Sequence, residues 1–188
     1  MQAVGRLDQD TTGLLLLSDD GAFVHAFTSP KRKVPKVYLA TVRHALDDEQ
    51  LAKLRGGVLL HGETKPSAAL GAERRDERLV ELTVLEGKYH QMKRMVAASG
   101  NRVEKLHRAR VGGYGLPDSL AEGAWRPTRR RNFAEQPPSP DALLPWFAET
   151  LHAHDDLVEP ESYPHYGDGE IVDAISAAQR AGSPRSRR

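Results

Sequence analysis

The sequence predicts an α+β domain with a mixed, largely antiparallel sheet and a few helices, followed by a mostly flexible tail. Segments of strand character outnumber helical ones over residues 1–131, and the connections between them suit antiparallel pairing. Beyond residue 132, prolines and glycines accumulate while large apolar residues become too few to close a second core. We therefore expect one folded domain over residues 1–131 and an acidic, Pro-rich, flexible C-terminal extension over residues 132–188.

The elements of the domain follow in order along the chain. The apolar run 13–17 and the polar residues 18–21 predict a buried strand and a turn, in which Asp19 or Asp20 caps a short helix over residues 22–27. Residues 36–43 alternate as a strand does. Residues 47–55 begin with acids and end with bases, which suits a helix dipole, and Gly56 and Gly57 end that helix. Strands over residues 79–85 and 103–111 flank a helix over residues 89–99.

Composition excludes several classes of protein. The chain has no cysteine, which rules out disulfides, thiolate zinc sites and a cysteine nucleophile, and fits a reducing cytoplasm. The longest apolar run, residues 14–17, is far short of the roughly 20 residues of a membrane span. The first ten residues contain no apolar signal core. His152 and His154 have no further ligand at a useful spacing, so no metal site is expected.

Charge is distributed unevenly along the chain. Residues 1–131 hold 23 Lys and Arg against 16 Asp and Glu, a net charge of +7, whereas residues 132–188 hold 4 against 10, a net charge of −6. Two ordinary solvated surfaces would account for this split, as would a basic domain that binds a polyanion and carries an acidic tail. Residues 135–140 indicate an extended linker, and residues 141–151 a short amphipathic helix.

Three segments carry residues suited to chemistry. Asp8 follows Arg6 and precedes a strand, so it could be a nucleophile or base held on a loop, or a side chain that caps local amides. Lys36 and Tyr38 share one face of a strand, which could be functional or simply exposed. The segment 86–95 combines buried methionines with a basic helix face, which could bind RNA or only be solvated.

Taken together and in order, these segments resemble a known family. The strings "GRLDQDTTGLLLLSDDG", "TSP", "KVY", "EGKYHQMKRM", "GNRVEKLHRARVGG" and "GAWRP" are similar to those of the bacterial ribosomal RNA pseudouridine synthases, over roughly residues 3–128. The branch most similar in pattern is the one that acts on small-subunit RNA. The resemblance implies the pseudouridine synthase catalytic fold and the isomerisation of one uridine in ribosomal RNA, most simply 16S RNA.

The resemblance also implies roles for particular residues. Asp8 matches the essential aspartate, Tyr38 the aromatic residue that stacks on the target uracil, and Lys93 a basic residue that pairs with the aspartate. Burial disfavours an ionised carboxylate and a neighbouring cation restores it, which is the physical reason for expecting such a pair. Residues expected to contact RNA are Arg6, Lys31, Arg32, Lys33, Lys36, His90, Gln91, Arg94, Arg108 and Arg110.

The implied reaction is a redox-neutral isomerisation, so no metal, nucleotide or organic cofactor is expected. The expected partner is ribosomal RNA or a pre-ribosomal particle. The protein itself is expected to be a monomer in the cytoplasm. Two alternatives remain at this stage, namely an inactive RNA-binding or ribosome-assembly module and an enzyme for large-subunit RNA. Relatives carry an RNA-binding domain and further catalytic strands before the Arg-Leu-Asp motif, so we also expect unpaired strand edges beside Asp8 and low activity.

Overall fold

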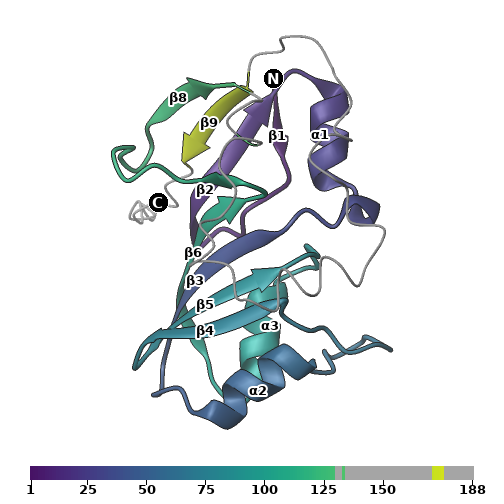
Figure 1. Ribbon diagram of the computed structural model, residues 1–188, viewed down its shortest axis with the longest axis vertical. Helices are drawn as coiled ribbons and strands as arrows, with labels where there is room; N and C mark the ends of the chain where they lie inside the picture. Colours follow the sequence, from purple (N-terminus) through teal and green to yellow (C-terminus); the bar gives the residue numbers. More distant parts are fainter. Residues whose placement is uncertain (130–132, 134–170, 176–188) are drawn as a thin grey trace, which may run out of the picture.

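Hydrogen-bonded strands in the order β4-β5-β3-β6-β2-β9-β8 carry the fold, with β1 on β2 and β7 on β6 (Figure 1). The computed structural model describes residues 1–129, 133 and 171–175. The strands are β1 (Gln2–Val4), β2 (Thr11–Ser18), β3 (Lys36–Val42), β4 (Gly71–Asp76), β5 (Leu79–Val84), β6 (Val103–Val111), β7 (Tyr114–Gly115), β8 (Trp125–Thr128) and β9 (Ile171–Ile175). The helices are α1 (Gly21–Thr28), α2 (Asp48–Gly56) and α3 (Gln91–Ala98), with a 3₁₀ turn η1 (Pro30–Arg32).

This architecture confirms the predicted α+β class with a mixed, largely antiparallel sheet. The one parallel pairing among the described strands joins Thr11–Gly13 of β2 to Leu106–Arg108 of β6. The predicted strands and helices within the described residues are present, with ends shifted by at most two residues. Asp20 caps α1, accepting hydrogen bonds from the amides of Ala22 and Phe23 at 2.9 and 3.1 Å. Asp47 and Gln50 form a capping box at the start of α2.

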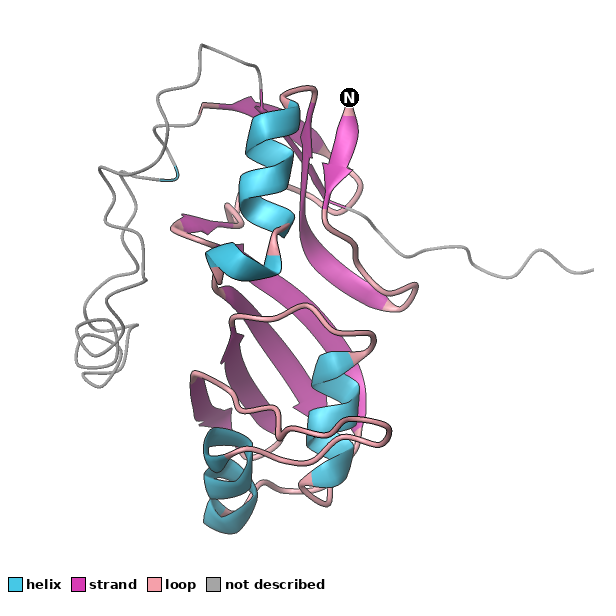
Figure 2. Ribbon diagram, turned by 90° about the vertical axis from the view of Figure 1, so that its right-hand side faces the viewer, coloured by secondary structure: helices cyan, strands magenta, loops and turns pink. Residues whose placement is uncertain are grey.

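Two apolar clusters support the two halves of the sheet. In the lower half of Figure 1, α2 and α3 pack with β3, β4, β5 and β6 around fully buried side chains such as Leu54, Leu82 and Met95. In the upper half, α1 packs with β1 and β2 around Leu14, Leu16 and Phe23. Figure 2 shows the same division, with α1 beside β2 and with α2 and α3 further down the sheet. The boundary between the two halves is where the chemistry-bearing segments meet.

Of the strands next to Asp8, β1 pairs with β2 alone among the described strands and so keeps the expected unpaired edge, whereas β2 is paired on both sides. Ser18, Leu17 and Leu16 pair with β1 on one side, and Leu14–Ser18 pair with β9 in an antiparallel ladder. Strand β9 lies between β2 and β8, and its five residues belong to the extension predicted to be flexible. This strand was not expected from the sequence. The predicted linker at 135–140 and helix at 141–151 lie outside the described residues.

No described helix is long and apolar enough to cross a membrane.

Candidate active site

Asp8 lies on the loop between β1 and β2, at a cleft between the two halves of the sheet. We define the cleft by its lining: the loop residues 4–8, Thr11 of β2, the end of α1 with residues 29 and 30, Lys36 and Tyr38 of β3, residues 84–89, Gln91 and Met92, and Leu106, Arg108 and Val111 of β6. Its volume is about 590 Å³, within the range of small-molecule sites. The Asp8 side chain is 31% exposed, and its carbonyl oxygen accepts a hydrogen bond from the Thr11 amide at 3.0 Å.

Strands β3 and β6 bring three further predicted residues to this cleft. Tyr38 on β3 lies directly opposite Arg108 on β6, and Lys36 lies two residues before Tyr38 on the same strand. The Lys36 ammonium donates to the Val34 carbonyl at 2.8 Å. Burial, reinforced by the charge of Arg108, lowers the pKa of Lys36 to about 8. The cleft therefore holds closely spaced positive charge, an arrangement suited to an anionic ligand.

Arg108 ties the Asp8 loop to strand β2. Its Nε donates to the Leu14 carbonyl at 2.8 Å, and its Nη1 donates to the Arg6 carbonyl at 3.1 Å. The residue is only 3% exposed. Its side chain is buried and donates to the backbone on both sides, and contact between Arg108 and RNA stays a prediction. Its Nη2 and the Thr11 hydroxyl are buried without a hydrogen-bond partner among the described residues.

The backbones of β2 and β6 approach very closely beside this clamp. A Cβ atom at Gly13 would lie 2.7 Å from the Arg108 amide nitrogen and 2.9 Å from its carbonyl carbon, and closer still to its carbonyl oxygen. Gly13 also has φ +103°, which L side chains rarely adopt. Glycine is therefore required at the point where the Asp8 loop joins the sheet.

The expected ion pair between Lys93 and Asp8 is not formed. The Lys93 ammonium instead contacts the carboxylate of Asp10, which is 70% exposed and two residues further along the loop. The hydrogen bond from Lys93 is the main cause that lowers the pKa of Asp10. Asp8 instead lies near His90, whose Nε2 is 3.7 Å from Asp8 Oδ1. Lys93 thus holds the far end of the loop.

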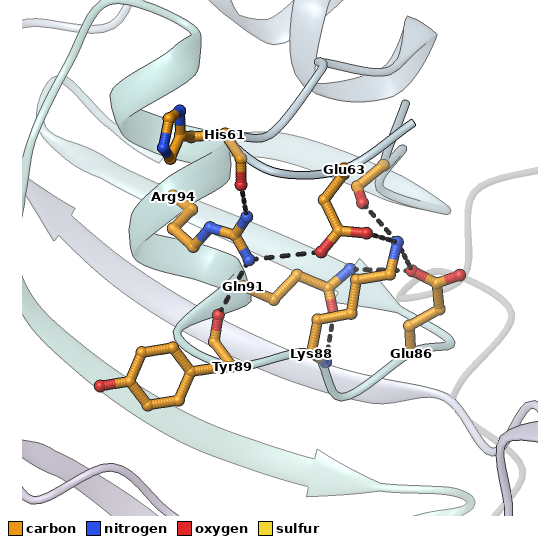
Figure 3. Close-up of polar contacts among 8 residues, drawn as sticks. His61, Glu63, Glu86, Lys88, Tyr89, Gln91 and Arg94 are labelled. Atoms are coloured by element: carbon orange, nitrogen blue, oxygen red, sulfur yellow. Dashed lines mark hydrogen bonds and ion pairs between the residues drawn. The ribbon is translucent and has the colours of Figure 1, made fainter. Parts of the chain in front are cut away.

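Polar contacts fix the segment between β5 and α3, as Figure 3 shows. The Lys88 ammonium contacts Ser67 Oγ and Glu86 Oε2, each at 3.0 Å, and Glu63 Oε2 at 3.6 Å. Arg94 donates from Nη2 to the His61 carbonyl at 2.5 Å and from Nη1 to the Tyr89 carbonyl at 3.4 Å.

These contacts bear on two residues expected to bind RNA. Gln91 is 5% exposed, and its Oε1 accepts from the Lys88 amide at 3.1 Å. Arg94 also forms an ion pair with Glu63 at 3.5 Å. Both side chains are therefore engaged within the protein, and contact between them and RNA stays a prediction.

The exposed basic residues near the cleft are those of the Asp8 loop and of η1. Arg6 is exposed beside Asp8, and Lys31, Arg32 and Lys33 are exposed just beyond Pro30, which lines the cleft. Arg110 is half-buried on β6. Within the described part of the chain, no group of three or more His, Cys, Asp and Glu residues is arranged to hold a metal ion.

Comparison with known proteins assigns this chain to a family. The model of the RNA pseudouridylate synthase family matches residues 1–98, which include Asp8, Tyr38 and Lys93. The chain belongs to the RNA pseudouridylate synthase family.

Its relatives agree with that assignment. The chain is 46% identical over 127 residues to "Ribosomal small subunit pseudouridine synthase A" of Haemophilus influenzae, covering 68% of this chain and 55% of that protein. It is 44% identical over 137 residues to the protein of the same name from Escherichia coli, covering 71% of this chain and 58% of that one. The chain thus spans somewhat more than half the length of the relatives it matches.

A solved member of the family shares the fold. A crystal structure of a pseudouridylate synthase superposes with a TM-score of 0.68 at 45% sequence identity, over 71% of this chain and 58% of that one. In this pseudouridylate synthase domain, sequence reasoning missed the buried Thr11 hydroxyl and the clamp formed by Arg108. A glycine just before the apolar run of β2 was the available signal, because glycine inside a strand often marks a close backbone approach.

Proposed function

We propose that this chain isomerises a uridine of small-subunit ribosomal RNA to pseudouridine, with Asp8 as the catalytic carboxylate. The observation that carries the proposal is the position of Asp8, on a glycine-anchored loop at a cleft that Tyr38, Lys36 and Arg108 also line. A cleft of about 590 Å³ is large enough for one extruded nucleoside. The names of the relatives supply the class of RNA.

The reaction balances without an external reagent. The bond between N1 of uracil and C1′ of the ribose breaks, and a bond between C5 and C1′ forms after the base has turned. C5 loses a proton and N1 gains one, and the isomerisation involves no net oxidation or reduction, so no external oxidant, reductant or cofactor is needed. Asp8 initiates cleavage of the glycosidic bond, and Tyr38 stacks on the uracil and assists the removal of the C5 proton. Stacking on Tyr38 also offsets part of the cost of extruding the base.

Binding of the RNA backbone is assigned to the exposed cations. Arg6 lines the cleft, and the exposed residues Lys31, Arg32 and Lys33 directly follow the lining residue Pro30, so phosphates on either side of an extruded uridine would meet them. Lys36 and His90 would face the target nucleotide from inside the cleft and from its rim. The net charge of +7 over residues 1–131 favours the approach of a polyanion. The partner is small-subunit RNA or its assembling particle, bound by a cytoplasmic monomer.

The test is pseudouridine formation in small-subunit RNA incubated with the purified chain. The product is mapped by carbodiimide labelling and reverse-transcription stops. Asp8→Asn is expected to abolish the product while the Kd for RNA stays within about twofold, because the substitution removes one charge and keeps the shape. Asp118→Asn, at an exposed position outside the cleft, is the matched control. Wild-type amounts of product from Asp8→Asn would refute the catalytic role of Asp8. Product formed only in large-subunit RNA would refute small-subunit RNA as the substrate.

A further inference from the structure

Tyr89 places a large aromatic ring in solvent at the rim of the cleft. The residue is 74% exposed, the highest value among the exposed large hydrophobic and aromatic residues of the described chain. It lines the cleft together with Asp8 and Tyr38, whereas Trp125, which is also exposed, does not. Leaving so much aromatic surface in water forgoes hydrophobic stabilisation, so the position suits a ring that another group covers.

The ring is one half of a stacked pair. The ring centroids of Tyr89 and His90 lie 3.8 Å apart at an interplanar angle of 19°. His90 in turn lies 3.7 Å from the Asp8 carboxylate, measured from Nε2 to Oδ1. A continuous path therefore leads from Asp8 through the imidazole to the phenol ring at the rim. A planar group next to a nucleotide held at Asp8 would meet this ring.

The backbone that carries the pair is held from several sides. Figure 3 shows the Tyr89 ring pointing away from the cluster that fixes its backbone. The Tyr89 carbonyl accepts from Arg94 Nη1 at 3.4 Å, and the Lys88 carbonyl accepts from the Gln91 amide at 3.1 Å. His90 has φ +48°, which is uncommon for a residue with a side chain and is typical of functional sites.

The cluster has a further property that limits its role. Glu63 and Glu86 lie against the charged groups of Lys88 and Arg94, so these cations are compensated within the protein. The cluster thus serves to hold the segment in place more than to attract phosphate. Tyr89 is therefore presented already ordered, and a ligand that stacks on it need not order the loop on binding.

We propose that Tyr89, backed by His90, is a stacking platform for the unpaired nucleobase next to the uridine held in the cleft. The proposal rests on the proposed function, since it takes RNA as the ligand. Extruding a uridine removes one stacking partner from its neighbour in the RNA, and an aromatic ring at the rim replaces that partner. Stacking on a phenol ring is tolerant of base identity because every base presents a π face.

The test compares three substitutions at this exposed position. Tyr89→Phe keeps the ring, Tyr89→Leu keeps apolar area without the ring, and Tyr89→Ala removes both. Tyr89→Phe is expected to behave like wild type, whereas Tyr89→Leu and Tyr89→Ala raise KM for RNA by about tenfold, the effect typical of one lost base–aromatic stack. The kcat at saturating RNA changes less than KM, because the platform contacts the neighbouring base and does not contact the reacting uracil. Trp125→Ala, also at an exposed aromatic residue, is the matched control.

A direct readout uses RNA that carries 2-aminopurine beside the target uridine. Binding to wild type and to Tyr89→Phe quenches its fluorescence, and binding to Tyr89→Ala does not. Equal quenching and equal KM for Tyr89→Ala and wild type would overturn the platform. If wild type binds RNA in a Tyr89-dependent way yet forms no pseudouridine, the proposed function fails and the platform stands. If wild type neither binds nor modifies RNA, both proposals are wrong.

Discussion

Replacing Gly13 by alanine tests whether the close crossing of β2 and β6 anchors the Asp8 loop. The new Cβ would lie 2.7 and 2.9 Å from backbone atoms of Arg108, inside the 3.0 Å that real Cβ contacts respect. Backbone cannot move aside as a flexible side chain does, so the two strands must separate. That separation strains the parallel pairing of Thr11–Gly13 with Leu106–Arg108.

The expected loss of stability has two parts. A side chain at a glycine-type φ such as +103° costs about 1–3 kcal/mol. Weakening about two ladder hydrogen bonds adds about 1–3 kcal/mol. Gly13→Ala should therefore lower the free energy of unfolding by roughly 2–6 kcal/mol, the sum of these two estimates. Activity should fall as well, because the Asp8 loop enters the sheet at this point.

Two matched glycines separate the causes. Gly62 has φ +80° with open space around its Cβ position, so Gly62→Ala carries only the backbone cost. Gly21 has neither a positive φ nor a close neighbour, so Gly21→Ala should be nearly neutral. Urea denaturation of the three variants, with the slope checked for constancy, gives the comparison. A Gly13→Ala variant no less stable than Gly62→Ala would show that the strands separate easily and would refute this reasoning.

Three other predictions follow from the site. Arg108→Met should lower kcat by about 100-fold through misplacement of the Asp8 loop. The slope of log RNA affinity against log salt concentration should stay as in wild type. A slope reduced by about 0.7, as for one lost contact to a single-strand phosphate, would show that Arg108 contacts RNA. Lys36 has its pKa lowered to about 8, so it loses its positive charge as the pH rises through that value. RNA affinity, measured at constant ionic strength, should therefore decline between about pH 7 and pH 9 in wild type and stay constant in Lys36→Arg, whose guanidinium stays charged. Equal declines in both proteins would exclude Lys36 from RNA binding. Lys93→Met should raise the pKa of Asp10 toward its ordinary value, as followed by NMR titration of the carboxyl carbon, because the hydrogen bond from Lys93 is the main lowering cause; an unchanged Asp10 titration would mean that the two side chains do not pair in solution.

Much of the fold followed from the sequence because its signals are local. Alternating apolar residues, an aspartate before α1, and the acids and bases at the two ends of α2 each act over a few residues, so the elements could be placed before their packing was known. Strand β4 was missed because its sequence, Gly-Ala-Glu-Arg-Arg-Asp, is mostly charged, as befits an edge strand paired only with β5. Strand β9 was missed because its partners, β2 and β8, are distant in the sequence.

For the site, the chemical groups present and the family they resemble could be read from the sequence, since motifs in a fixed order require no coordinates. Which of those groups lie together became known only from the folded chain. Nothing in the strand pattern around Tyr38 or Arg108 links the two residues, yet the pairing of β3 with β6 places them directly opposite each other at the cleft. Lys93 lies 83 positions from Asp10 and 85 from Asp8, so sequence separation does not indicate which of the two carboxylates pairs with its ammonium group. Contacts between distant segments depend on how the two halves of the sheet pack, which no local pattern encodes.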